Sequence, residues 1–450
     1  TGSLRSWHRS ATTPRSCNLC RSAGDPMKIA VIGTGIAGNV TAYRLRQDHE
    51  ISVFESGSYI GGHTNTVDVT ENGRQIPVDT GFIVFNDRTY PNFIRLLDDI
   101  GQESQQSEMS FSVKTEDNAL EYSGSSLNTL FAQRRNILRP AFHRMIRDIL
   151  RFNKTSLSGT DHLDYSKTLG DYLFENGYGQ EFVDHYLVPM AAAIWSAEPV
   201  AVLDMPVKFL ARFFANHGLL QLKDRPTWRV IKGGSRQYVE KLVAGHRDRI
   251  RLNTPVQSIR RIGDRVELRS ASGGTEMFDF VFVACHSDQA LSLIADPTAA
   301  EREVLGAIRY QPNEAILHTD VSLMPARRRA WAAWNYHVPQ NAARHVAVTY
   351  NMNILQGLQT EQQYLVTLNN DRRIDPAKII RTVQYEHPVF SHESVVAQQR
   401  QAEINCDRTF FCGAYWRNGF HEDGVVSALQ ALAHFEERLS DGKLYLRRAS

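Results

Sequence analysis

Five cysteines are few in a chain of 450 residues, and their odd number argues against a framework of disulfide bonds. No run approaches the roughly 18 consecutive apolar residues that a membrane-spanning helix requires. The 51 basic and 49 acidic residues nearly cancel to a formal net charge of +2, which argues against nucleic-acid binding by the chain as a whole. These absences predict a protein of the reducing cytoplasm, with peripheral contact at the inner face of the membrane left open.

Patterns that bind metal are also missing. The histidines show no paired HxxxH spacing or cluster, and Cys17 and Cys20 have no second cysteine pair at zinc-site spacing, so we predict no metal. These two cysteines lie in residues 1–26, a segment that is rich in arginine and serine and lacks the apolar centre of a secretory signal. We expect this segment to be a disordered tag or leader ahead of Met27, with an organelle transit segment as the alternative.

A glycine-rich motif follows Met27 directly. The apolar, β-branched run at 28–32 predicts a buried parallel strand, and a stretch of helical composition and a second short strand come after it. Gly33, Gly35 and Gly38 match GxGxxG between the first strand and the helix, and Glu55 ends the second strand. This context indicates a Rossmann-type dinucleotide-binding unit rather than a structural turn.

Each residue of the motif has a physical role in holding a dinucleotide. Gly33 permits the tight turn, Gly35 lets a pyrophosphate approach the backbone, and Gly38 lets the helix pack close to the strand. The free N–H groups and the dipole at the helix N-terminus favour phosphates. Glu55 is placed to accept hydrogen bonds from ribose hydroxyls, and its charge would repel the 2′-phosphate of NADP. The motif does not choose between NAD and FAD.

Two later segments carry a resemblance to a flavoprotein family. The pair Gly61-Gly62 and the turn Asp79-Thr80-Gly81 follow Glu55, and "TFFCGAYWRNGFHEDGVVSALQAL" occupies residues 409–432. Together with the opening motif, they resemble the flavin-containing amine oxidoreductase superfamily, which includes amine oxidases, protoporphyrinogen oxidase and the carotenoid desaturases. The resemblance extends over essentially the whole chain from Met27.

This resemblance implies an α/β fold in which a Rossmann-type FAD-binding domain is interleaved with a mixed α+β substrate domain. It assigns 27–105, 228–300 and 400–440 to the FAD-binding domain. The segments 106–227 and 301–399 would form the substrate domain, with helices from the first insert and an antiparallel sheet from the second. No cysteine has the sequence context of covalent flavin attachment, so FAD would be held non-covalently. The implied cofactor-binding residues are Gly33, Gly35, Ile36, Ala37, Gly38, Glu55, Ser56, Gly61, Gly62, His63, Thr64, Val256, Gly413, Asp423, Gly424 and Val425.

A narrower resemblance rests on "AAIWSAEP", "FFANHGLLQLKDRPTWRVIKGGSRQYV" and "GFHEDGVVSAL". These stretches resemble a bacterial branch of predicted NAD/FAD-binding proteins, which is similar to the N-terminal oxidase-like domain of plant cyclopropane fatty acid synthases. Members of that branch are associated with cyclopropane-fatty-acyl synthase-like methyltransferases. The resemblance therefore implies a hydrophobic substrate, a lipid acyl chain, and a methyltransferase as a partner.

Three positions depart from the pattern of the superfamily. Ala414 follows Gly413 where an acid often holds the ribityl chain, and His63 replaces the arginine of a Gly-Gly-Arg pattern. Glu314 stands in the stretch that looks comparable to the lysine-bearing strand start of amine oxidases. The last departure puts an amine oxidase function in doubt.

Three other segments have two interpretations each. Residues 134–154 predict a basic amphipathic helix, which is either an ordinary surface helix or one that lies on anionic lipid. A predicted helix at 206–220 and the aromatic residues Trp331, Trp334 and Tyr336 either pack in the core or line an apolar tunnel to the flavin.

His421 and Glu422 lie where the superfamily brings its last helix to the flavin, which makes them the candidate catalytic residues. A buried glutamate there could take a proton while a hydride goes to the flavin. In the other interpretation, Glu422 or Asp423 only caps the helix N-terminus. We therefore expect an FAD-dependent oxidoreductase that moves a hydride from a hydrophobic substrate, a lipid fatty acyl chain, to flavin. The alternatives are an amine oxidase and a low-turnover flavoprotein partner of a methyltransferase.

Overall fold

The computed structural model describes residues 26–116, 119–159, 165–221, 224–338, 347–369 and 373–440. The expectations for the leader segment, Cys17 and Cys20 included, lie outside the described residues. Within them, no helix combines the length and apolarity that crossing a bilayer requires. The same residues contain no group of three or more His, Cys, Asp or Glu side chains arranged to hold a metal ion.

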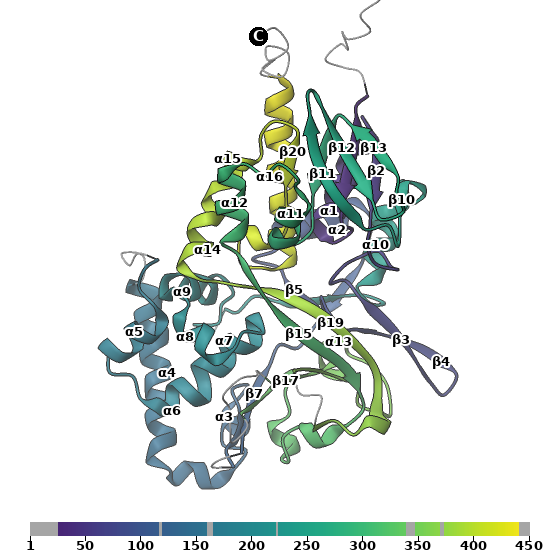
Figure 1. Cartoon of the computed structure of the whole chain (residues 1–450). Coiled ribbons are helices and arrows are strands. Elements are labelled where there is room, and N and C mark those ends of the chain that lie inside the picture. Colours follow the sequence, from purple (N-terminus) through teal and green to yellow (C-terminus); the bar gives the residue numbers. More distant parts are fainter. Residues whose placement is uncertain are drawn as a thin grey trace, which may run out of the picture.

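A five-stranded parallel sheet in the upper half of the molecule combines three distant parts of the sequence (Figure 1). β1 (Lys28–Ile32) and β14 (Phe280–Val283) are buried along almost their whole length, as their unbroken apolar runs predict for strands covered on both faces. The strand order is β10 (Ile250–Arg251), β2 (Glu50–Phe54), β1 (Lys28–Ile32), β14 (Phe280–Val283) and β20 (Thr409–Phe411).

Helices cover one face of this sheet and a smaller sheet covers the other. Ile29 and Val31 of β1 share a core cluster with the helical face, whereas Ala30 and Ile32 pack in the opposite layer, because successive strand residues point to opposite faces. The helical face consists of α1 (Ile36–Leu45), α2 (Pro91–Asp99), α10 (Arg236–Val243) and α16 (His421–Ser440). The other layer consists of β11 (Val256–Ile262), β12 (Arg265–Ser270), β13 (Thr275–Phe278), α11 (Ser287–Leu293) and α12 (Ala299–Gly306).

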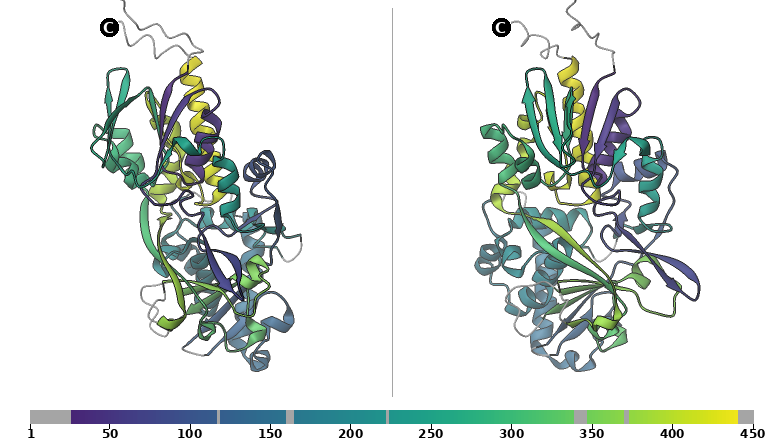
Figure 2. Two further views of the ribbon diagram at one scale, coloured as in Figure 1. Left: turned by 90° about the vertical axis from the view of Figure 1, so that its right-hand side faces the viewer. Right: turned by 45° about the vertical axis from the view of Figure 1, so that its right-hand side comes forward.

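A seven-stranded sheet forms the lower half, and it differs from the predicted antiparallel sheet of the second insert. Two of its strands, β7 (Phe111–Thr115) and β8 (Glu121–Ser123), come from the first insert, and β7 pairs in parallel with β16 (Trp334–Val338). The order is β19 (Ile379–Val389), β15 (Arg309–His318), β18 (Leu365–Leu368), β17 (Ala347–Asn351), β16 (Trp334–Val338), β7 (Phe111–Thr115) and β8 (Glu121–Ser123). The long antiparallel pair of β15 and β19 runs from the upper half into the lower half (Figures 1 and 2).

Helices from the first insert pack beside this sheet in one large apolar core. The predicted basic helix begins at Pro140 rather than at residue 134 and ends at Gly159 rather than at residue 154. Pro140 has no N–H and favours the first turn of a helix, and residues 134–138 form a separate short turn. These helices are α3 (Leu127–Leu130), α4 (Pro140–Gly159), α5 (Leu169–Glu175), α6 (Gln180–Phe182), α7 (Val188–Trp195), α8 (Pro199–Asp204) and α9 (Val207–Asn216).

Smaller elements join the two halves. A hairpin of β3 (Thr66–Glu71) and β4 (Arg74–Asp79) projects to one side in Figure 1. A three-stranded sheet has the order β5 (Val84–Asn86), β9 (Trp228–Ile231) and β6 (Ser104–Gln106). The remaining helices are α13 (Met352–Gln356), α14 (His392–Ala397) and α15 (Gln401–Ile404).

Candidate functional site

A cavity of about 1240 Å³ lies between the two halves of the molecule. Its volume exceeds the roughly 300–1,000 Å³ of ordinary small-molecule pockets. Its lining joins the glycine-rich turn after β1 to apolar side chains of the helices from the first insert. The cavity therefore has room for a dinucleotide together with a second molecule.

Glycines of the opening motif form a close-packed turn at one end of the cavity. Gly33 has a φ of +98°, and a Cβ there would lie 2.9 Å from the carbonyl oxygen of Ala284. Gly38 lies behind the turn, where a Cβ would overlap the carbonyl oxygen of Gly33, so α1 packs directly on the turn. Gly35 lines the cavity at the N-terminus of α1, and a Cβ on it would meet no protein atom within 4 Å. This open space beside a helix N-terminus fits a phosphate.

The second glycine pair lies against the first. Gly62 has a φ of +59°, and a Cβ on it would lie 3.2 Å from the Cα of Gly35. Gly61 has a φ of +137°, a conformation that side chains strongly disfavour. Predicted residues that line this end of the cavity are Gly33, Gly35, Ile36, Ala37, Glu55, Ser56, Gly61, Gly62 and His63. We name this end the phosphate cradle.

Glu55 places a fixed carboxylate beside the phosphate cradle. One of its oxygens accepts hydrogen bonds from the backbone N–H and the hydroxyl of Thr34, at 2.9 and 2.5 Å. Its other oxygen accepts from the N–H of Gly57 at 2.7 Å. A carboxylate at the end of the second strand is where a dinucleotide presents its ribose hydroxyls.

The C-terminal segment closes the same region of the cavity. A Cβ on Gly413 would overlap the ring of Tyr415, so a residue without a side chain is required after β20. Gly413 and Ala414 both line the cavity, and the backbone N–H of Gly413 donates to the hydroxyl of Ser427 at 2.9 Å. The side chain of Ala414 offers no group that could hold a ribityl chain.

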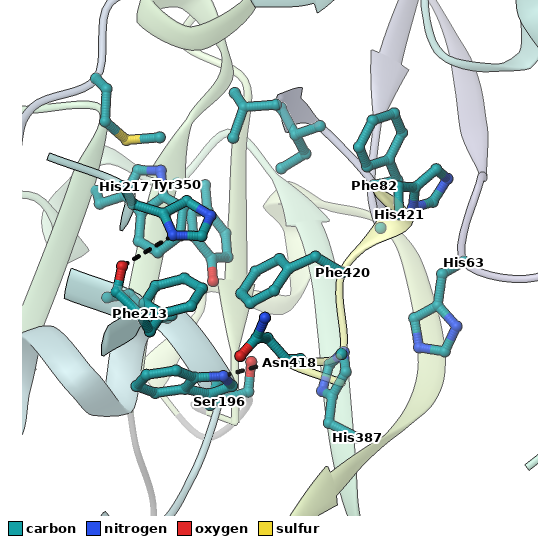
Figure 3. A pocket seen from close by; sticks show the side chains of 18 of the residues that line it. His63, Phe82, Ser196, Phe213, His217, Tyr350, His387, Asn418, Phe420 and His421 are labelled. Carbon is teal, nitrogen blue, oxygen red and sulfur yellow. Dashed lines mark hydrogen bonds between the residues drawn. The ribbon is translucent and has the colours of Figure 1, made fainter. Parts of the chain in front are cut away.

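His421 is the first residue of α16 and lines the cavity, with its ring beside that of Phe82 (Figure 3). The ring stacks on Phe82, with 3.5 Å between the ring centroids. Its Nε2 lies 3.0 Å from the hydroxyl of Thr64 and 2.9 Å from that of Tyr238. Burial lowers the pKa of His421 to about 3, so its imidazole is neutral. Thr64 itself does not line the cavity and acts by positioning His421.

Glu422 does not line the cavity, and its geometry contradicts the catalytic role predicted for it. Its carboxylate accepts hydrogen bonds from the backbone N–H groups of Asn92 and Phe93 and from the side-chain amide of Asn92, at 2.7 to 3.1 Å. These donors lie at the start of α2, so Glu422 caps the N-terminus of a neighbouring helix. The capping interpretation is therefore the correct one, although the helix is α2 rather than α16.

Asp423 also caps and does not reach the cavity. Its carboxylate accepts hydrogen bonds from the N–H groups of Asn418 and Phe420, at 3.2 and 2.9 Å, which fixes the turn that leads into α16. Burial raises the pKa of Asp423 to about 6. Because Asp423 does not line the cavity, its position gives no support to the predicted direct contact with the cofactor.

Three further residues predicted to touch the cofactor lie behind the cavity wall. A Cβ on Gly424 would lie 2.5 Å from the Cγ2 atom of Ile36, so this glycine allows α16 to approach α1. Val425 is buried in the core cluster of the helical face, and Val256 is buried in the cluster on the other side of the sheet. They shape the walls rather than the lining.

Three histidines from distant segments meet at the centre of the cavity. The ring centroid of His63 lies 5.2 Å from that of His387 and 6.2 Å from that of His286, and the ring stacks on Tyr385 at 4.8 Å. Figure 3 shows the rings of His63 and His387 near each other among the residues that line the cavity. Burial, followed by repulsion from the neighbouring histidines, holds the pKa of His63 well below its usual value. Burial likewise lowers the pKa of His387 to about 4, so both rings are neutral at pH 7.

Hydrogen bonds assign different tautomers to two of these rings. The side-chain oxygen of Asn313 accepts from Asn369 at 2.6 Å, so its NH₂ group faces Nδ1 of His387 at 2.9 Å. Neutral His387 therefore carries its proton on Nε2. His63 bonds to the backbone carbonyl of Glu386, and its Nε2 has no partner among the described residues. His63 thus donates through Nδ1 and keeps a lone pair on Nε2 that can take up a proton.

The opposite end of the cavity is apolar. Phe213 of α9 and Trp334 of β16 line it, as the tunnel interpretation predicts. Phe209 and Leu210 of α9 pack in the core instead, as the other interpretation predicts. Trp331 and Tyr336 do not line the cavity. The apolar end is formed mainly by Leu130, Ile146, Ile149, Leu150, Met190 and Ile194.

Glu314 does not line the cavity, so its side chain does not stand where the compared lysine would lie beside a flavin. Its carboxylate accepts a hydrogen bond from the side chain of Gln384, at 2.6 Å, on the exposed side of the β15–β19 pair. Arg225 is the one cationic side chain among the described lining residues, and no lysine is among them.

Several central residues were missed by the sequence analysis. His286 follows β14 at the carboxyl edge of the parallel sheet, where doubly wound folds bind their ligands, so the topology carried a signal for it. Tyr310, Tyr385 and His387 come from the β15–β19 pair, which carries no motif. Only the packing of the two halves brings them to the cavity.

Solved structures share this architecture. The crystal structure of a CLA-producing fatty acid isomerase from P. acnes has a TM-score of 0.67 over 92% of this chain and 100% of that chain, at 15% identity. Cyclohexylamine oxidase from Brevibacterium oxydans has a TM-score of 0.66 over 92% and 99%, at 16% identity. At these identities the likeness establishes the fold, and the predicted fold class is confirmed.

Sequence comparisons reach the family. Zeta-carotene desaturases of Solanum lycopersicum and Arabidopsis thaliana are 40% and 37% identical to this chain over 81 residues, which is 18% of this chain and only 13% and 14% of theirs. The family model described as "Flavin containing amine oxidoreductase" matches residues 36–349, well over half of the chain. The chain therefore belongs to the flavin-containing amine oxidoreductase family and is a flavin-dependent oxidoreductase.

Proposed function

We propose that this protein binds FAD non-covalently and moves a hydride to it from an apolar substrate, a lipid fatty acyl chain. The observation that carries the proposal is the continuity of the cavity, which joins the phosphate cradle to an apolar end lined by α4 and α7. A dinucleotide held at one end would meet an apolar molecule held at the other.

The residues at the phosphate cradle fit the dinucleotide part of FAD. Gly35 and Gly62 would face the phosphates and Glu55 the ribose. When bound, a flavin accepts a hydride equivalent, while the protein supplies orientation and excludes water. Cys285 lines the cavity, and burial raises the pKa of its thiol to about 12. Since a protonated thiol is a poor nucleophile, this supports non-covalent binding.

The apolar end supports an acyl substrate. Isoleucine, leucine and methionine side chains from two helices gain free energy by covering a hydrocarbon chain, at about 25 cal/mol for each Å² removed from water. The structural neighbour from P. acnes is by its name a fatty acid isomerase, so the same fold accommodates a fatty acid.

The reaction removes two hydrogens from the substrate. A hydride would leave one carbon for the bound flavin and a proton would leave the adjacent carbon, so that a carbon–carbon double bond forms. The neutral rings of His63, His286 and His387 give that proton a polar path at the centre of the cavity. Molecular oxygen or a quinone would then take up the two electrons from the flavin. His421 has its Nε2 already engaged and holds the start of α16 in place.

Anaerobic titration of the purified, flavin-loaded protein tests this proposal. Long-chain acyl lipids should bleach the flavin spectrum and yield a product two hydrogens lighter, whereas putrescine and cyclohexylamine should not bleach it. Acid precipitation should release FAD into the supernatant. Bleaching by the amines alone would establish an amine oxidase. A product of unchanged mass with a shifted double bond would establish an isomerase. No bleaching together with tight binding to a cyclopropane-fatty-acyl synthase-like methyltransferase would favour the low-turnover partner.

A further inference from the structure

The apolar end of the cavity reaches the surface at Leu127 of α3 and Leu150 of α4. Both side chains line the cavity, yet they are 76% and 49% exposed. A side chain that is both part of a cavity wall and open to solvent marks the opening. We name these two residues the cavity mouth.

More apolar surface lies in the turn that joins the two helices of the mouth. Ile137 is 48% exposed and Leu138 is 85% exposed. The short segment from α3 to α4 therefore exposes four large aliphatic side chains. A concentration of exposed apolar side chains around an opening is typical of an interaction surface, because leaving them in water is unfavourable.

The same segment is strongly basic. Residues 127–154 contain seven arginines and lysines and one acid, Asp148. The carboxylate of Asp148 lies 3.3 Å from the guanidinium of Arg151, and the carboxylate of Glu181 lies 3.2 Å from the guanidinium of Arg144. Among the residues that the structure describes, the other four arginines of the segment have no carboxylate partner; they are Arg134, Arg135, Arg139 and Arg147.

Exposed aliphatic side chains that are flanked by uncompensated arginines match the chemistry of an anionic lipid surface. The aliphatic groups enter the boundary between headgroups and acyl chains, while the arginines meet the lipid phosphates. We propose that the cavity mouth docks on an anionic bilayer, so that an acyl chain passes from the bilayer into the cavity without crossing water. The acyl chain rests on the proposed function, whereas the docking rests on this surface alone.

Sedimentation with lipid vesicles tests the docking on the flavin-loaded full chain. The protein should sediment with vesicles of equal parts phosphatidylglycerol and phosphatidylcholine, remain in solution with phosphatidylcholine alone, and be released as salt rises. Leu150→Glu should lower the partition coefficient by roughly tenfold, and Arg139→Glu with Arg147→Glu by at least roughly tenfold. Thermal unfolding and the flavin spectrum check that these variants remain folded.

Matched controls separate docking from general surface effects. Val396 of α14 is 47% exposed and does not line the cavity, so Val396→Glu should bind vesicles as the wild type does. Arg260→Glu with Arg302→Glu reverses two exposed arginines elsewhere and should also have no effect. Equal binding by the Leu150 variant and the wild type would overturn the proposal. Failure of the wild type to sediment with the anionic vesicles would also overturn it. So would a dimer of the wild type that Leu150→Glu dissociates, because this face would then be an interface between copies of the chain. Bleaching of the wild-type flavin by a short, water-soluble acyl substrate is measured without vesicles, so it judges the proposed function separately from the docking.

Discussion

Gly424 packs directly against the side chain of Ile36, because a Cβ on Gly424 would lie 2.5 Å from the Cγ2 atom of Ile36. Gly424 lies in the first turn of α16 and Ile36 is the first residue of α1, so the two cofactor motifs from opposite ends of the chain meet where both helices begin. The phosphate cradle and the C-terminal closing segment therefore form one unit.

Gly424→Val should separate these two helices. Overpacking of this kind costs about 1–3 kcal/mol, and we expect a lower midpoint of unfolding and weaker FAD binding together. Chemical denaturation and fluorescence titration with FAD measure the two effects. Gly274→Ala is the control, because its Cβ would meet nothing nearer than Ser270 Oγ at 3.8 Å. An unchanged FAD affinity in a destabilised Gly424→Val would show that the contact does not support the cradle.

Gly35→Ala should have the opposite profile, with stability kept and FAD binding lost. Its Cβ would meet no protein atom within 4 Å and Gly35 already has a φ of −63°, which alanine adopts freely. The added methyl would occupy the space that a phosphate needs. We expect the dissociation constant for FAD to rise by roughly tenfold or more, which corresponds to about 1.4 kcal/mol, without a change in the apoprotein's unfolding midpoint. A variant that binds FAD like the wild type would place the phosphates elsewhere.

Glu422→Gln should destabilise the fold without slowing flavin reduction. The carboxylate serves three donors at the start of α2, and hydrogen bonds to a charged group contribute about 1.5–3 kcal/mol. Unfolding by urea measures the loss, and anaerobic stopped-flow reduction measures the chemistry. If instead reduction slows by orders of magnitude while stability is retained, Glu422 has a catalytic role that its position here does not reveal.

The sequence alone predicts the phosphate cradle well because its requirements are local. A strand, three glycines and an acid at fixed spacing leave Gly33, Gly35 and Glu55 few other roles. The role of Glu422 in the last helix was predicted wrongly because its carboxylate binds the start of α2. That contact joins residues more than 300 positions apart, and no sequence spacing reveals it. His387 was missed for the same reason, since β19 reaches the cavity only when the lower sheet packs against the upper one.

Acid should destabilise the apoprotein through His421. Its pKa is about 3 in the folded state and about 6.5 when unfolded, so between these values the unfolded chain binds the extra proton. The free energy of unfolding that neutral His421 contributes is fully present above about pH 6.5. It is lost as the pH falls toward the folded-state pKa, at about 1.4 kcal/mol per pH unit. His421→Gln should unfold with a shallower dependence on pH in urea titrations across this window. Parallel curves for the two proteins would mean that another group sets the acid response.

FAD binding should tighten as the pH falls, and His63 should be the cause. His63 follows Gly62, whose backbone lies against Gly35 in the phosphate cradle, and its Nε2 has no partner. Burial and the neighbouring His387, His286 and His421 keep its pKa well below 6.5 in the free protein, so the ring is neutral there. A diphosphate beside the ring favours the protonated form, so binding takes up a proton.

The affinity should therefore rise by up to about tenfold per pH unit below the pKa of the complex and level off once the free protein is protonated as well. His63→Arg carries a permanent charge and should bind FAD tightly with little dependence on pH, whereas His63→Gln should bind weakly at every pH. Fluorescence titration of the three apoproteins from neutral to mildly acidic pH measures this. The groups that face His63, namely Tyr385, His387, His286, His421 and the backbone of Glu386, are the same in all three proteins. A pH profile shared by the wild type and His63→Arg would assign the proton to one of these neighbours instead.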